Sequence, residues 1–197
     1  KQEQVFTEAD RNANNPVLWI GNSQMSGSKI VLLSDLETKK LDSIKITNNV
    51  FIIEKDTLSD DGYQQIKGGL LDGAFKDGKL DNIVITKNTE MVYYLYNDED
   101  LQLIGIDKTT CSALQMNFVE GKIDDITFLV SPIGDVYPED KIPLNDRTLK
   151  GFIWRIKERP ETIEDLFDKN DKAEQFPDIL RFKFPEKSEK EEIEKIT

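Results

Sequence analysis

One short phrase occurs three times along this chain of 197 residues. Residues 41–46 read LDSIKI, residues 80–85 read LDNIVI and residues 123–128 read IDDITF, so successive copies begin 39 and 43 residues apart. Self-similarity at such a period is typical of repeat architectures. Stacked β repeats build a long continuous surface rather than a compact pocket, and the repetition therefore favours binding over catalysis.

Short turns precede the second and third copies. Asp77-Gly78 and Glu120-Gly121 each separate two apolar, alternating runs. Gly accepts the positive φ of a two-residue hairpin turn, so these pairs predict tight turns between antiparallel strands. The repeating unit is therefore strand, turn, strand.

Further strands are expected after the first two copies, at residues 50–53 and 91–96. After the third copy the pattern breaks at Pro132, Gly134 and Pro138, which we expect to end strands. The sequence predicts an all-β protein of repetitive antiparallel strands.

Strict alternation of side chains assigns faces to these strands. Lys45, Val84 and Thr127 are predicted on the outer face. Alternation puts the aspartates of the phrase, Asp42, Asp81 and Asp124, on the inner side with the isoleucines. The apolar residues that we expect to form an inner groove are Ile44, Ile46, Phe75, Ile83, Ile85, Leu114, Met116, Phe118, Ile126 and Phe128.

The composition excludes several function classes. The chain has no His, which removes Ser–His–Asp and Cys–His catalysis and His-ligated metals. With 38 acidic against 26 basic residues the net charge is −12, which argues against nucleic-acid binding. There is no apolar run long enough to span a membrane. We expect no enzyme activity, no cofactor and no metal; a two-carboxylate glycan enzyme remains a remote alternative.

Three local features carry a structural and a functional interpretation each. Cys111 is expected to be a small buried hydrophobe, with a reactive thiol as the alternative. Residues 56–62 resemble a calcium loop but lack its acidic spacing, which favours a solvated turn. Tyr93, Tyr94 and Tyr96 are expected to pack across strands, with ligand contact by one face as the alternative.

The C-terminal third differs from the repeat. We expect a β-repeat domain at 1–145, a cap at 146–176 and a charged, disordered tail at 177–197. The cap contains a short helix predicted at 162–167. Four apolar residues are expected to seal one end of the repeat stack: Phe152, Trp154, Leu166 and Phe167.

A basic stretch within the cap reverses the local sign of charge. Its residues are candidates for contact with an anion, and pairing with the nearby acids of the helix is the alternative. The candidates are Arg147, Lys150, Arg155 and Arg159.

Several segments of the chain together match the motifs of one known family. The segments are YYLY at 93–96, LIGIDK at 103–108, CS at 111–112, YPED at 137–140, LKGFIWR at 149–155 and ERP at 158–160. They resemble the OstA-like, LptA-type family of lipopolysaccharide-transport proteins. Residues 49–53 and Gly21-Asn22 resemble the repeated Gly-Asn-Val start of that family, with Asn48 where Gly is usual. The similarity covers about residues 14–168.

The resemblance implies an open, twisted β-jellyroll with an apolar interior, which carries lipid A acyl chains through the periplasm. It implies a non-enzymatic role in outer-membrane assembly, with lipopolysaccharide or a related lipid as ligand. Self or other envelope transport proteins would join by edge-strand pairing. A structural β scaffold that binds no lipid is the alternative. The chain opens at Lys1 without a signal peptide, which predicts a processed or trimmed start.

The net charge opposes one part of this expectation. A charge of −12 repels the phosphates of a lipopolysaccharide head group. Either the head group stays outside, near the basic stretch, or the cargo is different.

Overall fold

The computed structural model describes residues 1–7 and 15–161. By its contacts the chain divides into two compact units, Lys1–Ile156 and Lys157–Thr197. The fold described below is that of the first unit. The helix expected at 162–167, with Leu166 and Phe167, and the tail expected at 177–197 lie outside the described residues.

The first unit is one antiparallel sheet of ten strands. The strands are β1 (Gln2–Thr7), β2 (Val17–Ile20), β3 (Ser23–Ser26), β4 (Lys29–Ser34), β5 (Leu41–Lys55), β6 (Tyr63–Lys76), β7 (Lys79–Tyr96), β8 (Leu103–Val119), β9 (Lys122–Val130) and β10 (Ile133–Tyr137). Three 3-10 turns follow, η2 (Glu139–Lys141), η3 (Leu144–Asp146) and η4 (Ile156–Glu158). The prediction of an all-β, open, twisted, jellyroll-like sheet is confirmed.

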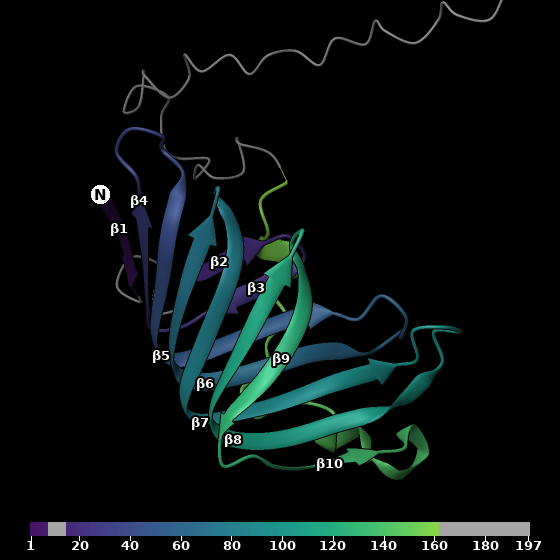
Figure 1. Ribbon diagram of the computed structural model, residues 1–197. Helices are drawn as coiled ribbons and strands as arrows, with labels where there is room; N and C mark the ends of the chain where they lie inside the picture. Colours follow the sequence, from purple (N-terminus) through teal and green to yellow (C-terminus); the bar gives the residue numbers. More distant parts are fainter. Residues whose placement is uncertain (8–14, 162–197) are drawn as a thin grey trace, which may run out of the picture. The chain divides into compact units, whose positions relative to one another are not determined.

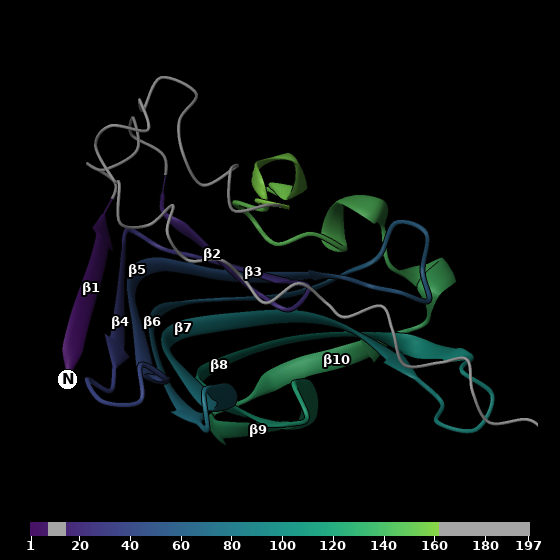
Figure 2. The same ribbon diagram turned by 90° about the horizontal axis from the view of Figure 1, so that it is seen from above.

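The four long strands β5 to β8 bend, and their two halves belong to different layers (Figures 1 and 2). β4 pairs with the first part of β5, whereas β3 pairs with its second part. At the opposite edge β9 and β10 divide β8 in the same way. The first layer contains β1, β4 and β9 and the second contains β2, β3 and β10. The prediction of separate strands at 50–53 and 91–96 is thus wrong. These residues belong to the second-layer halves of β5 and β7.

Pairs of residues with positive φ make the bend. Asn48 and Asn49 have φ of 57° and 53°, and Lys87 and Asn88 have 70° and 55°. The strand register shifts at both pairs, between Thr47 and Val50 and between Thr86 and Thr89. Asn tolerates this left-handed region better than most residues, so the chain bends there without a Gly.

The strand end expected at Gly134 is also wrong, because Gly134 lies inside β10. A Cβ at this position would approach the backbone oxygen of Lys108 to 2.7 Å. The absence of a side chain therefore permits close pairing of β10 with β8 rather than ending the strand.

The aspartates of the repeated phrase occupy β-bulges. Leu33 pairs with Ser43 and Ser34 with Leu41, which leaves Asp42 as an extra residue in β5. Asp81 and Asp124 are the extra residues at the equivalent places in β7 and β9.

The bulges change which residues face inward. Leu41, Leu80 and Ile123 join the isoleucines of the phrase in the interior. The strict alternation assumed above therefore fails at these three points, since a bulge adds one residue to the period of two.

Two hydrophobic clusters lie on opposite faces of the second layer. The inner cluster fills the space between the layers and contains buried residues of both, such as Ile46 and Ile66. The outer cluster lies between the second layer and the segment 138–156, which we call the covering segment; it includes Val92, Ile106 and Leu149. The second layer is therefore buried on both faces.

Two buried glutamines attach the covering segment to the sheet. Gln65 in β6 donates to the Arg147 carbonyl at 2.8 Å and accepts from the Leu149 N–H at 2.8 Å. Gln24 in β3 donates to the Ile153 carbonyl at 2.9 Å and accepts from the Arg155 N–H at 2.7 Å. Each amide satisfies one donor and one acceptor of the segment, as a neighbouring strand would.

The sequence predicted that Phe152 and Trp154 seal one end of a repeat stack, and this prediction is wrong. The covering segment, which contains both residues, instead covers a face of the sheet. Phe152 packs against Tyr63 with ring centroids 5.0 Å apart, and Trp154 packs against Trp19 at 5.1 Å. Tyr63 is the first residue of β6, and Trp19 lies in β2. Both residues belong to the second layer. The aromatic pairs add packing energy to the glutamine hydrogen bonds.

The first prediction concerns the glutamine contacts. Gln65→Met keeps the volume but leaves the Arg147 carbonyl and the Leu149 N–H without their partner, so the free energy of unfolding should fall by about 1–3 kcal/mol. Gln102→Met, at an exposed position, should change it by less than about 0.5 kcal/mol. Urea unfolding of both variants measures the difference; equal stabilities would contradict the role given to Gln65.

The second prediction concerns the β8–β9 turn, where Glu120 and Gly121 have φ of 52° and 77°. A Cβ on Gly121 would meet nothing within 4 Å, so a substitution there tests backbone conformation alone. Gly121→Ala should cost about 1 kcal/mol and Gly121→Asn less, because Asn adopts positive φ more easily. Thermal unfolding compares the two; a stabilised Ala variant would be incompatible with this turn.

Candidate functional site

The ten apolar residues expected to form an inner groove all lie in or against the inner cluster. Six of them are buried: Ile44, Ile46, Ile83, Ile85, Leu114 and Met116. The other four are partly buried and pack against that cluster: Phe75, Phe118, Ile126 and Phe128. The sequence therefore identified one face correctly, and most of the space between the layers is filled by these side chains.

A pocket remains between the layers on the side away from the bend. Its cavity volume is about 20 Å³, and the space measures about 340 Å³ when the open solvent at its entrance is included. Its floor consists of five apolar side chains of both layers: Met25, Ile52, Ile66, Ile83 and Met116. We call the other lining residues the mouth; they are Ser23, Glu54, Gln64, Tyr93, Phe118 and Ile123.

The mouth contains polar groups held by hydrogen bonds. The Ser23 hydroxyl donates to the Glu54 carboxylate. The Gln64 side chain accepts from the Tyr94 N–H at 2.7 Å and donates to Asp56 at 2.7 Å. These contacts fix the polar side chains at the edge of an apolar floor.

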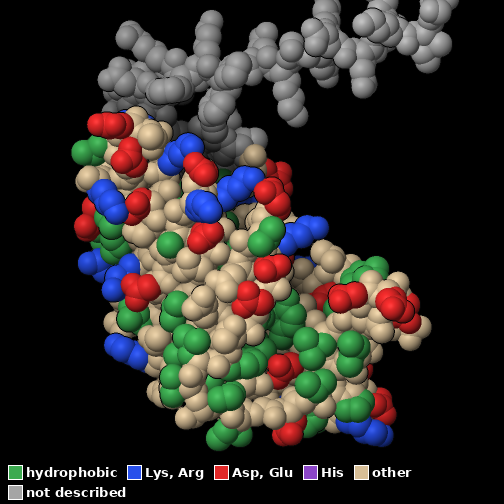
Figure 3. All heavy atoms as spheres, in the orientation of Figure 1, with side chains coloured by type: hydrophobic (Ala, Val, Ile, Leu, Met, Phe, Trp, Pro, Cys, Tyr) green, Lys and Arg blue, Asp and Glu red, His purple; other side chains and the backbone are tan. Residues whose placement is uncertain are grey.

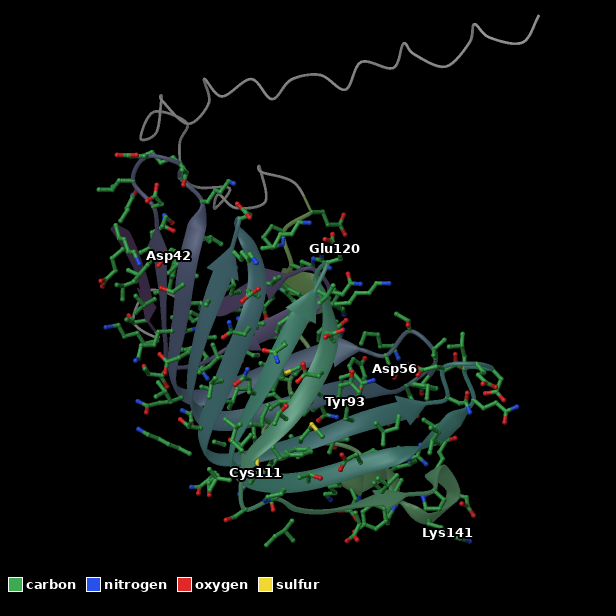
Figure 4. The ribbon with its side chains drawn as sticks, viewed as in Figure 1. Asp42, Asp56, Tyr93, Cys111, Glu120 and Lys141 are labelled. Atoms are coloured by element: carbon green, nitrogen blue, oxygen red, sulfur yellow. The ribbon has the colours of Figure 1, made fainter. Side chains whose placement is uncertain are left out.

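Tyr93 brings a phenol to this mouth from β7 (Figure 4). Burial raises the pKa of the Tyr93 phenol, and the negative charges of Glu54 and Asp56 raise it further. The phenol therefore stays protonated through the physiological range and can donate a hydrogen bond.

The three neighbouring tyrosines divide between the two faces of β7, as alternation predicts. Tyr93 packs against the inner cluster, whereas Tyr94 and Tyr96 belong to the outer cluster. The Tyr96 hydroxyl donates to Asp56 at 3.1 Å, and burial followed by this hydrogen bond raises the pKa of Tyr96. Packing is thus confirmed for Tyr94 and Tyr96, and Tyr93 is the one that lines the pocket.

The segment 56–62 is a turn, as expected, but its first residue is not solvated. Asp56 is buried and accepts hydrogen bonds from the N–H groups of Leu58 and Ser59 at 2.7 and 2.9 Å. Its carboxylate is thus occupied by the turn and by neighbouring side chains. Across residues 1–7 and 15–161 no group of three or more His, Cys, Asp or Glu could hold a metal ion.

The basic candidates do not gather at the pocket. Arg147 pairs with Glu139 at 3.1 Å and donates to the Glu139 carbonyl at 2.7 Å. Arg155 donates to the Asn15 carbonyl at 2.7 Å, and Lys150 is exposed. Arg159, the fourth candidate, also lies outside the residues that line the pocket. For Arg147 the partner is an acid of η2, so the ion pairing expected from the sequence occurs with a different element.

Sequence reasoning missed the polar residues that matter most in this structure. Gln24 and Gln65, which attach the covering segment, were not singled out, and neither were Glu54 and Gln64 at the mouth. A polar side chain within a run of strand residues was the available signal, but it does not reveal the partner, because the partners are up to 131 residues away.

Comparisons with known proteins add no relative. No family model, no curated protein and no solved structure matches this chain. No helix among the described residues is both long and apolar enough to cross a membrane.

The expectation for Cys111 is confirmed, since it is buried in the inner cluster near the bend (Figure 4). Burial raises the pKa of its thiol, which lowers the fraction of reactive thiolate.

The third prediction follows from this burial. Cys111 should react with a thiol reagent such as dithionitrobenzoate only as fast as the protein opens, and rapidly in denaturant. The matched control moves the thiol by one residue to the exposed Ser112, in a Cys111→Ser, Ser112→Cys variant, which should react at once. Rapid reaction of native Cys111 would contradict its buried position.

Proposed function

We propose that this protein is a non-enzymatic lipid-binding protein of lipopolysaccharide transport or outer-membrane assembly in the periplasm. It holds an acyl chain between its two β layers. The observation that carries the proposal is the pocket between the layers, whose floor is made of Met25, Ile52, Ile66, Ile83 and Met116. The compartment and the pathway rest on the family resemblance of the sequence.

The pocket is small in this structure. Its cavity volume is about 20 Å³, well below the 300–1,000 Å³ of typical ligand pockets, so even one acyl chain requires the two layers to separate. A lipid with several chains requires the layers to separate further. The large side chains Tyr93 and Phe118, one from each layer, line the opening where such a separation begins.

Energetics indicate a weak complex. Burial of ten methylenes contributes about 8 kcal/mol, at about 0.8 kcal/mol each. Association costs at least about 4 kcal/mol, which leaves about 4 kcal/mol and a dissociation constant near 1 mM. A single chain is thus exchanged easily, as a protein that passes a lipid to a partner requires.

The edges of the sheet support the partner part of the proposal. Within the described residues, β1 and β2 have an unpaired side at one edge, and β9 and β10 at the other. Unpaired strand edges invite pairing with another chain. Other envelope transport proteins, or a second copy, are the partners that we propose.

A scaffold that binds no lipid is the second candidate, and two observations favour it. Six of the ten groove candidates are already buried by the protein itself. Hydrophobic side chains also gather on the surface where β8, β9 and β10 lie (Figure 3). Ile133 in β10 is 76% exposed. An exposed apolar patch is typical of a surface that binds protein.

The glycan enzyme has less support. Its mechanism needs two carboxyl groups about 5–9.5 Å apart across the substrate. The pocket lining includes one carboxylate, Glu54.

The fourth prediction separates carrier from scaffold. A photo-crosslinking benzoylphenylalanine in place of Phe118, in the mouth, should form an adduct with added lipopolysaccharide on irradiation. The same group in place of the exposed Thr127 on the outer face of β9 is the control and should form none. Adducts at Thr127 alone, or at neither site, would favour the scaffold.

A further inference from the structure

The charge of the residues that line the pocket does not suit a lipid with an anionic head group. Among the residues that line it, Glu54 is the one charged side chain, and there is no Lys or Arg. A phosphate or carboxylate head at this opening would face a carboxylate, with no cation among the lining residues. Like charges at close range disfavour binding.

Glu54 is placed to accept a donor from a ligand. One carboxylate oxygen accepts from the Ser23 hydroxyl, and within the described residues the side chain has no ion pair. The Ser23 contact holds the carboxylate at the opening, because Ser23 and Glu54 are paired neighbours on β3 and β5. The carboxylate therefore retains acceptor capacity toward the pocket.

The basic residue that follows Glu54 in the chain makes its contacts elsewhere. Lys55, next to Glu54 in the chain, donates to the carbonyl oxygens of Ser59 and Asp60 in the turn that follows. Its ammonium also lies 4.8 Å from the centre of the Tyr63 ring. Lys55 thus stabilises the 56–62 turn and does not neutralise the mouth.

The two turns at this end of the second layer add negative charge. The segment 56–62 contains Asp56, Asp60 and Asp61, and the segment 97–100 contains Asp98, Glu99 and Asp100. The rise in the pKa of Tyr93 has Glu54 and Asp56 among its causes, which places their negative potential at a residue of the mouth. The Tyr93 phenol adds an aromatic ring, and such rings attract cations.

We propose that the pocket selects a single-chain amphiphile with a positively charged amine head, whose chain lies on the apolar floor and whose head pairs with Glu54 beside Tyr93. This inference rests on the proposed lipid-binding function and makes it more specific. An anionic lipid would have to keep its phosphates away from the mouth.

The fifth prediction uses three ligands with the same twelve-carbon chain and different heads. Dodecylamine, monolaurin and dodecyl phosphate compete, below their micelle concentrations, with the neutral apolar fluorophore N-phenylnaphthylamine bound to the whole chain. Dodecylamine should displace the fluorophore at a concentration about tenfold lower than dodecyl phosphate, a difference of about 1.4 kcal/mol. The preference should shrink as sodium chloride rises, because salt screens the charge at the mouth.

Matched variants locate the effect. Glu54→Gln keeps the shape and an acceptor for Ser23 and should abolish the preference for the amine. Glu90→Gln, on the strand β7 but paired with Lys67 outside the pocket at 2.8 Å, removes one negative charge elsewhere and should leave the preference intact. Circular dichroism of both variants checks that the fold is kept.

The outcomes are distinct. Equal displacement by all three ligands, tighter binding of monolaurin or of the phosphate, or a preference that survives Glu54→Gln would overturn the inference while lipid binding stands. If neither the fluorophore nor any of the three ligands binds, the proposed lipid-binding function fails, and the inference fails with it.

Discussion

Burial of aliphatic side chains between the two halves of one bent sheet is the interaction on which this structure depends. A sheet with one apolar face has to bury that face, and this chain buries it against itself. The bend is possible because Asn48, Asn49, Lys87 and Asn88 adopt positive φ at matching places in β5 and β7. Ile44, Ile46, Ile83 and Ile85 then pack against residues of the second layer such as Ile52, Ile66 and Met91.

The same bend determines where the pocket lies. The layers join at the bend, where Cys111 is buried, and the pocket lies on the opposite side. Longer strands on that side end in polar turns, which bring Glu54 and Gln64 to the edge of an apolar floor. The covering segment covers the outer face of the second layer through Gln24 and Gln65, whereas the pocket lies on the inner face of that layer.

Local features of the fold were predictable from the sequence. The turns at Asp77-Gly78 and Glu120-Gly121 follow from residues that accept positive φ, and both occur where expected. The inner face follows from alternation, and all ten apolar candidates lie in or against one cluster. These predictions succeed because turn chemistry and side-chain period act over a few residues.

Non-local features were not predictable in the same way. The bulges at Asp42, Asp81 and Asp124 are defined by the partner strand, so a single strand does not reveal them. The place of Phe152 and Trp154 depends on Tyr63 and Trp19, and the mouth combines residues of six strands. The alternation of apolar and polar residues does not reveal these contacts. Alternation describes the two faces of one strand, whereas these contacts depend on which distant segments meet.

The central proposal is that the space between the layers binds an alkyl chain. A crystal structure with a terminally brominated dodecylamine tests it most directly, because the anomalous signal of bromine locates the end of the chain. The account predicts a bromine peak on the pocket floor, between Ile66 of the second layer and Ile83 and Met116 of the first. Bromine found only on the outer surface, with the floor closed and unchanged, would contradict it.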